Sequence, residues 1–561
     1  MSRLLALLAL PLSVSGFGVE CDILDNDKFN IKDGKYDYYD GLALKVNSFF
    51  LSKGISFLPR LDAIYKFGNV TRFFGPEGKR TYTSIEDLHR AYLSRASDPV
   101  TVIKGVLQAA MKLNVDVHAI EKLLPSAEVL SMAEKSAARF REGKPLSMLD
   151  GVPFVVKNDV NVKGISTLAG MSATSKVGKA IKPAAENDRV VARLLDSGAI
   201  LIGVAAQSEL GLSPTGFSEW KKGPLNPHRL NRFTGGSTSG VAAAVSMGLV
   251  PFGVGTDGNG CNRIPASLTG VVGMAPTYGR VRFDAPTASA FKNVHYGPIA
   301  GNVEDVAHVM SVIADGKENH EYDTYYHMHY RQGFLPKMHL RAFTHPSNEV
   351  VKVGIFTKWA DSCSKDVIKV FYDTVHKYPG WKVDHFTVPQ MAGQLKTQII
   401  SLLGEYGNLL SEGSLSHLEY SSKIMVGLAR TVAGSKSKKK AVSSIRGWAM
   451  AKWEAVFKKV DFIVVPTVRE VAPKIPGKYF DHRPFDPAFE EMFVRSTWVT
   501  NLLGYPSISV SMGMSKEGFP MGLQVIGKHW EDDKLMKVAS QFQQYTEPTR
   551  AKPTMYNHEL I

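Results

Sequence analysis

The sequence is poor in cysteine and in long apolar runs. Its 561 residues include three cysteines, Cys21, Cys261 and Cys363, too few for a disulfide framework. No run reaches about eighteen apolar residues, so we expect a chain that is soluble or peripheral to a membrane rather than one that spans it. There is no internal repeat, and the GxSxG motif of α/β-hydrolases is absent. These absences argue against a disulfide-stapled module, a membrane-helix bundle and a nucleophile elbow.

Basic residues outnumber acidic ones, giving a formal net charge of +14. They are spread along the chain, and KSKKK at 436–440 is the one dense run. A nucleic-acid-binding protein gathers its basic residues on one surface, so we expect no nucleic acid partner. We expect the run to be a solvated loop; the alternative is a peripheral contact with an acidic membrane surface or another polyanion.

The N-terminus has the pattern of a secretory signal peptide. Arg3 precedes an apolar segment at 4–12, and Gly16 fits the small-residue rule for cleavage before Phe17. The pattern predicts a signal peptide over 1–16 and a secretory or extracellular location. The alternative is an uncleaved anchor that lies in the membrane interface.

A secretory location has two consequences for the covalent chemistry of the chain. The sequence Asn69-Val-Thr is an N-glycosylation sequon, which would make the protein a glycoprotein. In an oxidising compartment Cys21 and Cys363 could pair, which would leave Cys261 free. Sequence alone gives no distance between them.

Strand-like and helical patterns alternate over most of the chain. Residues 17–84 are a mixed, aromatic N-terminal extension. From 85 to 145 the apolar residues recur with a helical period, and from 151 to about 310 apolar strand-like runs alternate with helical segments. This alternation predicts an α/β sheet.

The second half continues the pattern after an interruption. Residues 316–349 are polar and aromatic, as in an insertion, and residues 365–460 again have helical texture. Three strand-like runs and a closing helix follow. We therefore expect one large domain over 85–545 and a short tail at 546–561.

Two patterns that could indicate a cofactor or a metal are incomplete. Residues 253–258 fit GxGxxG, but a dinucleotide site needs a helix directly after it, and we expect Pro265 to prevent one. His320, His327 and His329 have no carboxylate or cysteine pattern beside them to complete a metal site. We expect surface histidines, no cofactor and no metal.

Lys157 follows the apolar run GVPFVV at 151–156. A lysine that leaves a buried strand is partly desolvated, which favours the neutral amine that can act as a base. Taken alone, a lysine that extends to solvent from the end of its strand is the simpler interpretation.

Two glycine-rich segments accompany this lysine. TGGSTSG at 234–240 places hydroxyl groups on a glycine platform before an apolar helix, and GVGTDGNGCNRIPAS at 253–267 surrounds Cys261 with successive N–H groups. A base, a hydroxyl relay, a nucleophile and N–H groups that can form an oxyanion hole are what acyl transfer needs.

The three segments, in this order, resemble the amidase signature family. Its lysine segment, its serine–glycine segment and its GTDxGGSxRxPA segment all have counterparts, and 24 positions separate Ser237 from Cys261, as in the family. The resemblance covers residues 85–545. It implies a single large α/β domain with a mixed central sheet and helices on both faces, and a hydrolase acting on the carbon–nitrogen bonds of linear amides.

The resemblance also implies roles for individual residues. Lys157 takes the position of the general base, Ser237 that of the bridging serine, and Cys261 that of the nucleophile. The backbone of Gly258, Asn259, Gly260 and Cys261 takes that of the oxyanion hole. Asp257 and Arg263 match positions that order the loop through charge-assisted hydrogen bonds.

Four residues depart from the family pattern. Cys261 replaces the nucleophilic serine, and Asn259 replaces a loop glycine, at a cost if this position needs a positive φ. Ser239 replaces a glycine near the bridging serine, and Asn262 replaces an apolar residue.

Cys261 admits three interpretations. It is a working nucleophile that forms a thioester, the remnant of a lost activity in a protein that binds amide-like ligands, or an acyl carrier in a member redirected to amide-bond synthesis or acyl transfer. A buried Lys157 is costly unless it is used, which favours an active enzyme. We therefore expect a small-molecule or lipid amide or ester as substrate, with fatty acid amides as one option.

Overall fold

The computed structural model describes residues 80–282, 293–314, 350–406, 412–432, 436–481 and 486–557. The expected signal peptide, nearly all of the N-terminal extension with its sequon and Cys21, and the insertion with its three histidines lie outside these ranges. The proposed pairing of Cys21 with Cys363 is therefore untested. Cys363 itself is buried, and burial raises the pKa of its thiol to about 12.

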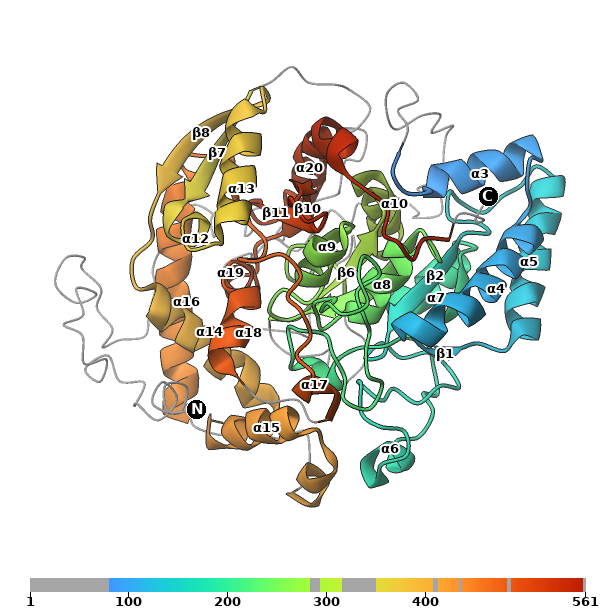
Figure 1. Ribbon diagram of the computed structural model, residues 1–561, viewed down its shortest axis with the longest axis horizontal. Coiled ribbons are helices and arrows are strands. Elements are labelled where there is room, and N and C mark those ends of the chain that lie inside the picture. Colours follow the sequence, from blue (N-terminus) through green and yellow to red (C-terminus); the bar gives the residue numbers. More distant parts are fainter. Residues whose placement is uncertain are drawn as a thin grey trace, which may run out of the picture.

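The described residues form a large sheet with helices packed on it (Figure 1). The strands are β1 (Ile120–Leu123), β2 (Pro153–Lys157), β3 (Ile200–Ala205), β4 (Phe252–Asp257), β5 (Val272–Ala275), β6 (His295–Ala300), β7 (Val351–Phe356), β8 (Trp381–Phe386), β9 (Phe462–Pro466), β10 (Ser507–Met514) and β11 (Pro520–Ile526). Their order across the sheet is β1-β3-β2-β4-β6-β5-β10-β11-β9-β7-β8. Strand β2 is parallel to β3 and β4, β7 is parallel to β8 and β9, and the other pairs are antiparallel. The sheet is thus mixed, as expected.

The helices occupy the segments between the strands. The longer ones are α3 (Ile85–Ser94), α4 (Pro99–Val117), α5 (Ser126–Arg141), α7 (Arg189–Asp196), α8 (Ser239–Ser246), α9 (Arg263–Thr269), α10 (Val303–Ile313), α13 (Lys365–Lys377), α14 (Met391–Tyr406), α15 (Tyr420–Val432), α16 (Lys436–Phe457), α18 (Pro487–Val494), α19 (Trp498–Leu503) and α20 (Asp532–Thr546). The short ones are α6 (Lys176–Ala180), α12 (Thr357–Ala360), α17 (Lys478–Asp481) and the 3₁₀ turns Glu209–Gly211, Glu412–His417 and Glu547–Thr549. Among the described residues no helix combines the length and the apolar character needed to cross a bilayer.

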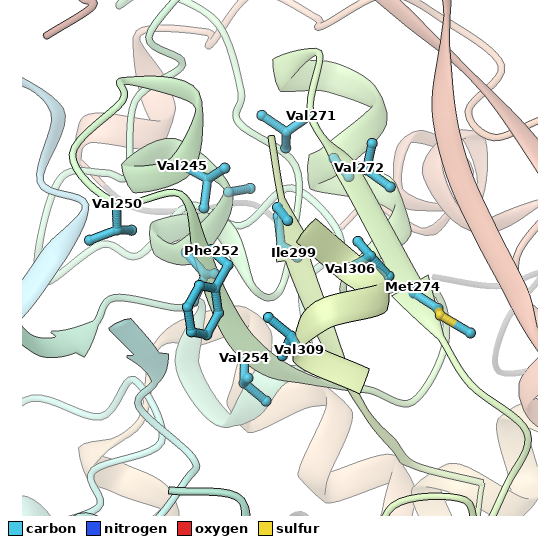
Figure 2. Close-up of a cluster of buried hydrophobic side chains, with 14 of the residues drawn as sticks. Val245, Val250, Phe252, Val254, Val271, Val272, Met274, Ile299, Val306 and Val309 are labelled. Atoms are coloured by element: carbon cyan, nitrogen blue, oxygen red, sulfur yellow. The ribbon is translucent and has the colours of Figure 1, made fainter. Parts of the chain in front are cut away.

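The middle of the sheet holds a buried apolar core. Helix α8 packs against β4 and β6, and α10 packs against β6 and β5. Figure 2 shows the buried side chains that they share, among them Val245 of α8, Phe252 and Val254 of β4, Ile299 of β6 and Val309 of α10. Because both faces of these strands are covered, their sequences are nearly continuous apolar runs.

The single α/β domain is confirmed, but three local expectations are wrong. The 365–460 region is not wholly helical, because β8 adds an edge strand beside β7. The KSKKK run begins helix α16 instead of forming a loop. A short helix, α9, does follow the glycine-rich loop. Pro265 stands in its first turn, where a backbone N–H needs no helical partner.

Candidate active site

The ends of two parallel strands bring Lys157 and Thr256 together. Strands β2 and β4 are neighbours, with Val156 opposite Val254, so their carboxyl ends meet at one edge of the sheet. The Lys157 side chain is buried. Its Nζ donates to Thr256 Oγ1 at 2.8 Å and lies 3.2 Å from Thr256 O.

Ser237 lies just before α8, within reach of the lysine. Lys157 Nζ donates to Ser237 Oγ over 2.9 Å, and both side chains are buried. The Gly236–Ser237 peptide bond is cis. A Cβ on Gly236 would stand 2.4 Å from Gly216 Cα, so only glycine allows the chain to pass this closely.

Cys261 lies beside Ser237 on the loop that precedes α9. The N–H of Thr238 donates to Cys261 O at 3.2 Å, which joins the two segments, and Cys261 is partly exposed. Within the described chain no hydrogen bond joins Cys261 Sγ to Ser237 Oγ. The Tyr406 phenol donates to Leu210 O at 2.8 Å; burial raises the pKa of this phenol, and the charges of Cys261 and Asp159 raise it further.

The loop at 258–260 is fixed from outside. Thr497 Oγ1 donates to Asn259 O at 2.7 Å, and Gln398 Nε2 donates to Gly258 O at 3.0 Å. Gly260 has a φ of 111° and donates its N–H to Asp257 Oδ1 at 2.7 Å. That amide is therefore engaged, and the N–H groups of Gly258, Asn259 and Cys261 remain as the candidates for an oxyanion hole.

Asp257 and Arg263 form a buried bidentate pair beneath this loop. Arg263 Nε donates to Asp257 Oδ2 at 2.9 Å and Nη2 to Oδ1 at 2.8 Å. Burial alone would raise the pKa of Asp257, but the Arg263 charge and the hydrogen bonds hold it well below its usual range. The pair fixes the conformation of the loop.

The structure accommodates the departures at Asn259, Asn262 and Ser239. Asn259 is not among the described residues with positive φ. Replacing the family's glycine with asparagine therefore causes no backbone strain at this position. Asn262 Nδ2 contacts the carbonyls of Gly255, Met274 and Gly297, and its Oδ1 accepts from Thr238. Ser239 Oγ donates to Gly216 O at 2.9 Å.

Asp159 and Gln398 contact the site and were missed by sequence reasoning. Asp159 Oδ2 lies 3.1 Å from Lys157 Nζ. Asp159 lies in the turn that follows β2, so the strand periodicity does not predict its contact with Lys157. Gln398 lies on α14, 140 positions from Gly258, and no sequence pattern predicts its contact with the loop. No group of three histidine, cysteine, aspartate or glutamate side chains in the described ranges could hold a metal ion.

The protein-family model described as Amidase matches residues 101–536. The chain belongs to the amidase signature family. It is 30% identical over 516 residues to a fatty acid amide hydrolase of Medicago truncatula, covering 90% of this chain and 82% of that one. It is 28% identical to a glutamyl-tRNA(Gln) amidotransferase subunit of Methanosarcina mazei, over 76% of this chain and 90% of that one.

Solved amidase structures share its fold. A bacterial aryl acylamidase aligns with a TM-score of 0.71 at 20% identity, over 83% of this chain and 97% of that one. A peptide amidase in complex with chymostatin aligns with a TM-score of 0.68 at 23% identity, over 84% and 99%. Members of the family hydrolyse carbon–nitrogen bonds, and this chain is an amidase-family hydrolase that acts on amides.

Proposed function

We propose that this amidase hydrolyses amides or activated esters of an apolar acyl group, with Cys261 as nucleophile and Ser237 and Lys157 as its proton relay. The observation that carries the proposal is the 2.9 Å contact between Lys157 Nζ and Ser237 Oγ, in the segment bonded to Cys261 through Thr238. A buried lysine whose proton reaches a hydroxyl beside a thiol is arranged for proton transfer.

The surroundings of the loop favour an apolar acyl group. A Cβ placed on Gly258 would lie 3.2 Å from Val294 Cγ2 and 3.5 Å from Leu402 Cδ1. These residues belong to one hydrophobic cluster with Leu210, Leu403 and other side chains of α14 and α15. The relatives named fatty acid amide hydrolase support the same class of substrate.

The thiol makes protonation of the leaving group decisive. When Cys261 adds to the carbonyl, the tetrahedral intermediate can expel either the thiolate or the amine, and the thiolate leaves more easily unless the nitrogen is protonated. The amine therefore departs with a proton from the Ser237–Lys157 relay, and water then hydrolyses the thioester.

The test combines turnover with detection of the acyl-enzyme. Fatty acid amides and aryl esters of graded chain length are given to the wild type, Cys261→Ala and Cys261→Ser, and the quenched proteins are analysed by peptide mass spectrometry. We expect an acyl adduct on Cys261 and turnover in the wild type, and neither in Cys261→Ala. Ligand-induced thermal stabilisation without adduct or turnover would instead favour a binding protein. Acyl transfer to an added amine in place of water would favour synthesis.

A further inference from the structure

Asp159 stands two residues beyond the end of β2, beside Lys157. Its Oδ2 lies 3.1 Å from Lys157 Nζ and accepts a 2.6 Å hydrogen bond from the Thr256 hydroxyl. Lys157 is 1% exposed and Asp159 is 7% exposed. An ammonium ion buried this deeply needs a counter-charge, because desolvation makes an isolated buried charge unfavourable. Asp159 supplies that charge.

The atoms around Lys157 Nζ are arranged for a charged lysine. Nζ has Thr256 Oγ1, Thr256 O, Ser237 Oγ and Asp159 Oδ2 within 3.2 Å. The Thr256 hydroxyl gives its only proton to Asp159, so toward Lys157 it acts as an acceptor. An ammonium group has three donors and no lone pair, which suits acceptor surroundings. A neutral amine would have only the Ser237 hydroxyl to donate to it.

The other titratable groups near this pair are accounted for. Cys261 comes from the loop before α9, and the Tyr406 phenol, at the end of α14, has its pKa raised by burial and then by Cys261 and Asp159. Asp257, at the end of β4, is paired with Arg263. In the described ranges Asp159 is thus the one carboxylate in ion-pair contact with the lysine.

We propose that Asp159 is a positioning residue that keeps Lys157 as an ammonium ion with one N–H directed at Ser237, so that the resting lysine is a proton donor for the leaving amine and not a base awaiting a proton. The proposal rests on the proposed function for its consequence in catalysis. The charge state of the lysine can be measured without turnover.

The proton balance of acylation needs no outside acid. The S–C bond forms between Cys261 and the acyl carbon, and the C–N bond breaks. Ser237 gives its proton to the departing nitrogen and takes one from the Lys157 ammonium. The proton lost by the thiol enters the relay in the same concerted step, so the net transfer is one proton from sulfur to nitrogen and Lys157 ends the step as an ammonium ion paired with Asp159. In deacylation water adds to the thioester, the C–S bond breaks, and one water proton returns to sulfur.

Asp159→Asn separates a donor role from a structural one. The amide side chain keeps the shape and an acceptor for Thr256 but removes the counter-charge, so Lys157 loses its proton at lower pH. Amide hydrolysis needs a proton on the leaving amine, whereas an aryl ester expels a phenolate without one. We expect kcat for the amide to fall about a hundredfold at neutral pH and kcat for the aryl ester to change by less than about threefold. The alkaline limb of the amide profile should move to lower pH, and Asp159→Glu should restore part of the amide activity.

Asp188→Asn is the matched control. Asp188 is another buried carboxylate, which accepts a hydrogen bond from Tyr296, whereas Asp159 accepts one from Thr256. It should lower thermal stability without changing the ratio of amide to ester activity. Equal losses on both substrates in Asp159→Asn, with an unmoved pH profile, would overturn the donor role.

A direct measurement distinguishes this proposal from the proposed function. With [¹⁵N]lysine-labelled full-length protein, the Lys157 Nζ resonance is identified by its absence in Lys157→Met. We expect an ammonium chemical shift at neutral pH in the wild type and a transition to the amine at lower pH in Asp159→Asn. A neutral amine in the wild type would refute the proposal even in an active enzyme. An ammonium in a protein that forms no acyl-enzyme would refute the catalytic function and leave the ion pair standing.

Discussion

Two buried ion pairs, Asp257–Arg263 and Asp159–Lys157, stand at the carboxyl ends of neighbouring strands and differ in what surrounds them. Arg263 is bidentate with Asp257, and its remaining donors go to Thr497 O, Thr500 Oγ1, Asn501 Oδ1 and Gln524 Oε1. Lys157 contacts Asp159, Thr256 and the Ser237 hydroxyl. In the Asp257–Arg263 pair, every described partner of the arginine is a structural group. In the Asp159–Lys157 pair, the lysine also contacts a hydroxyl group that can transfer a proton.

The difference shows how one edge of the sheet serves two purposes. The guanidinium stays protonated at any working pH and matches a carboxylate in a rigid fork, whereas a lysine ammonium changes its protonation state readily. The arginine pair therefore suits a scaffold for the loop that carries Cys261. The lysine pair is suited to proton transfer, because the lysine can lose and regain its proton. Each pair can be broken separately, and the two losses should appear in different measurements.

Lys157→Met should have the largest effect, and on activity. Without the relay the leaving amine receives no proton, so we expect kcat/KM for an amide to fall about 10⁴-fold, or about 5.5 kcal/mol. The unfolding free energy should fall by less, toward the lower end of about 3–5 kcal/mol, because Asp159 loses its counter-charge but keeps its hydrogen bond from Thr256. Amide kinetics and denaturant unfolding measure the two quantities. A drop in stability as large as the drop in activity would contradict the separation.

Arg263→Met should have the next largest effect, and on stability. It leaves the wholly buried Asp257 without its partner, and breaking a buried pair in this way costs about 3–5 kcal/mol. Denaturant unfolding measures this loss. Arg263→Lys is the control: it restores the charge but not the bidentate geometry, so an intermediate loss is expected. An unchanged unfolding free energy in Arg263→Met would show that the pair does not hold the loop.

The sequence was most informative where chemistry is local. The spacing of Lys157, Ser237 and Cys261 led to the family, because short motifs record which residues surround a reacting atom. The helical reading of 365–460 failed at β8, whose pattern of exposed and buried residues is that of an edge strand. The prediction that Pro265 prevents a helix after the glycine-rich loop failed, because a proline disrupts a helix in its interior but not in its first turn.

The contacts that sequence reasoning missed depend on the folded arrangement. Asp159 was visible as a neighbour of Lys157, but its orientation toward Nζ depends on how the chain continues past β2. Gln398, which donates to Gly258 O, and Asn293, which donates to Gln398, come from separate segments that only folding brings together. Arg446, from α16, adds a further hydrogen bond to Asn293. A single sequence carries no signal for such long-range polar contacts, since each residue alone looks like an ordinary helix or loop position.

Gln398→Leu should have the smallest effect. It tests whether the hydrogen bond from Gln398 strengthens the Asn259 N–H as a donor in addition to supporting the loop. The hydrogen bond from Gln398 to Gly258 O polarises the peptide whose N–H belongs to Asn259, which makes that N–H a better donor to an oxyanion. Because the oxyanion forms only in the transition state, kcat should fall about tenfold, or about 1.4 kcal/mol, with KM unchanged. Gln394→Leu is the matched control, because Gln394 is equally buried on α14 but bonds Pro389 and Trp453. It should cost similar stability and leave kcat intact; equal kcat losses in the two variants would show that Gln398 only supports the helix.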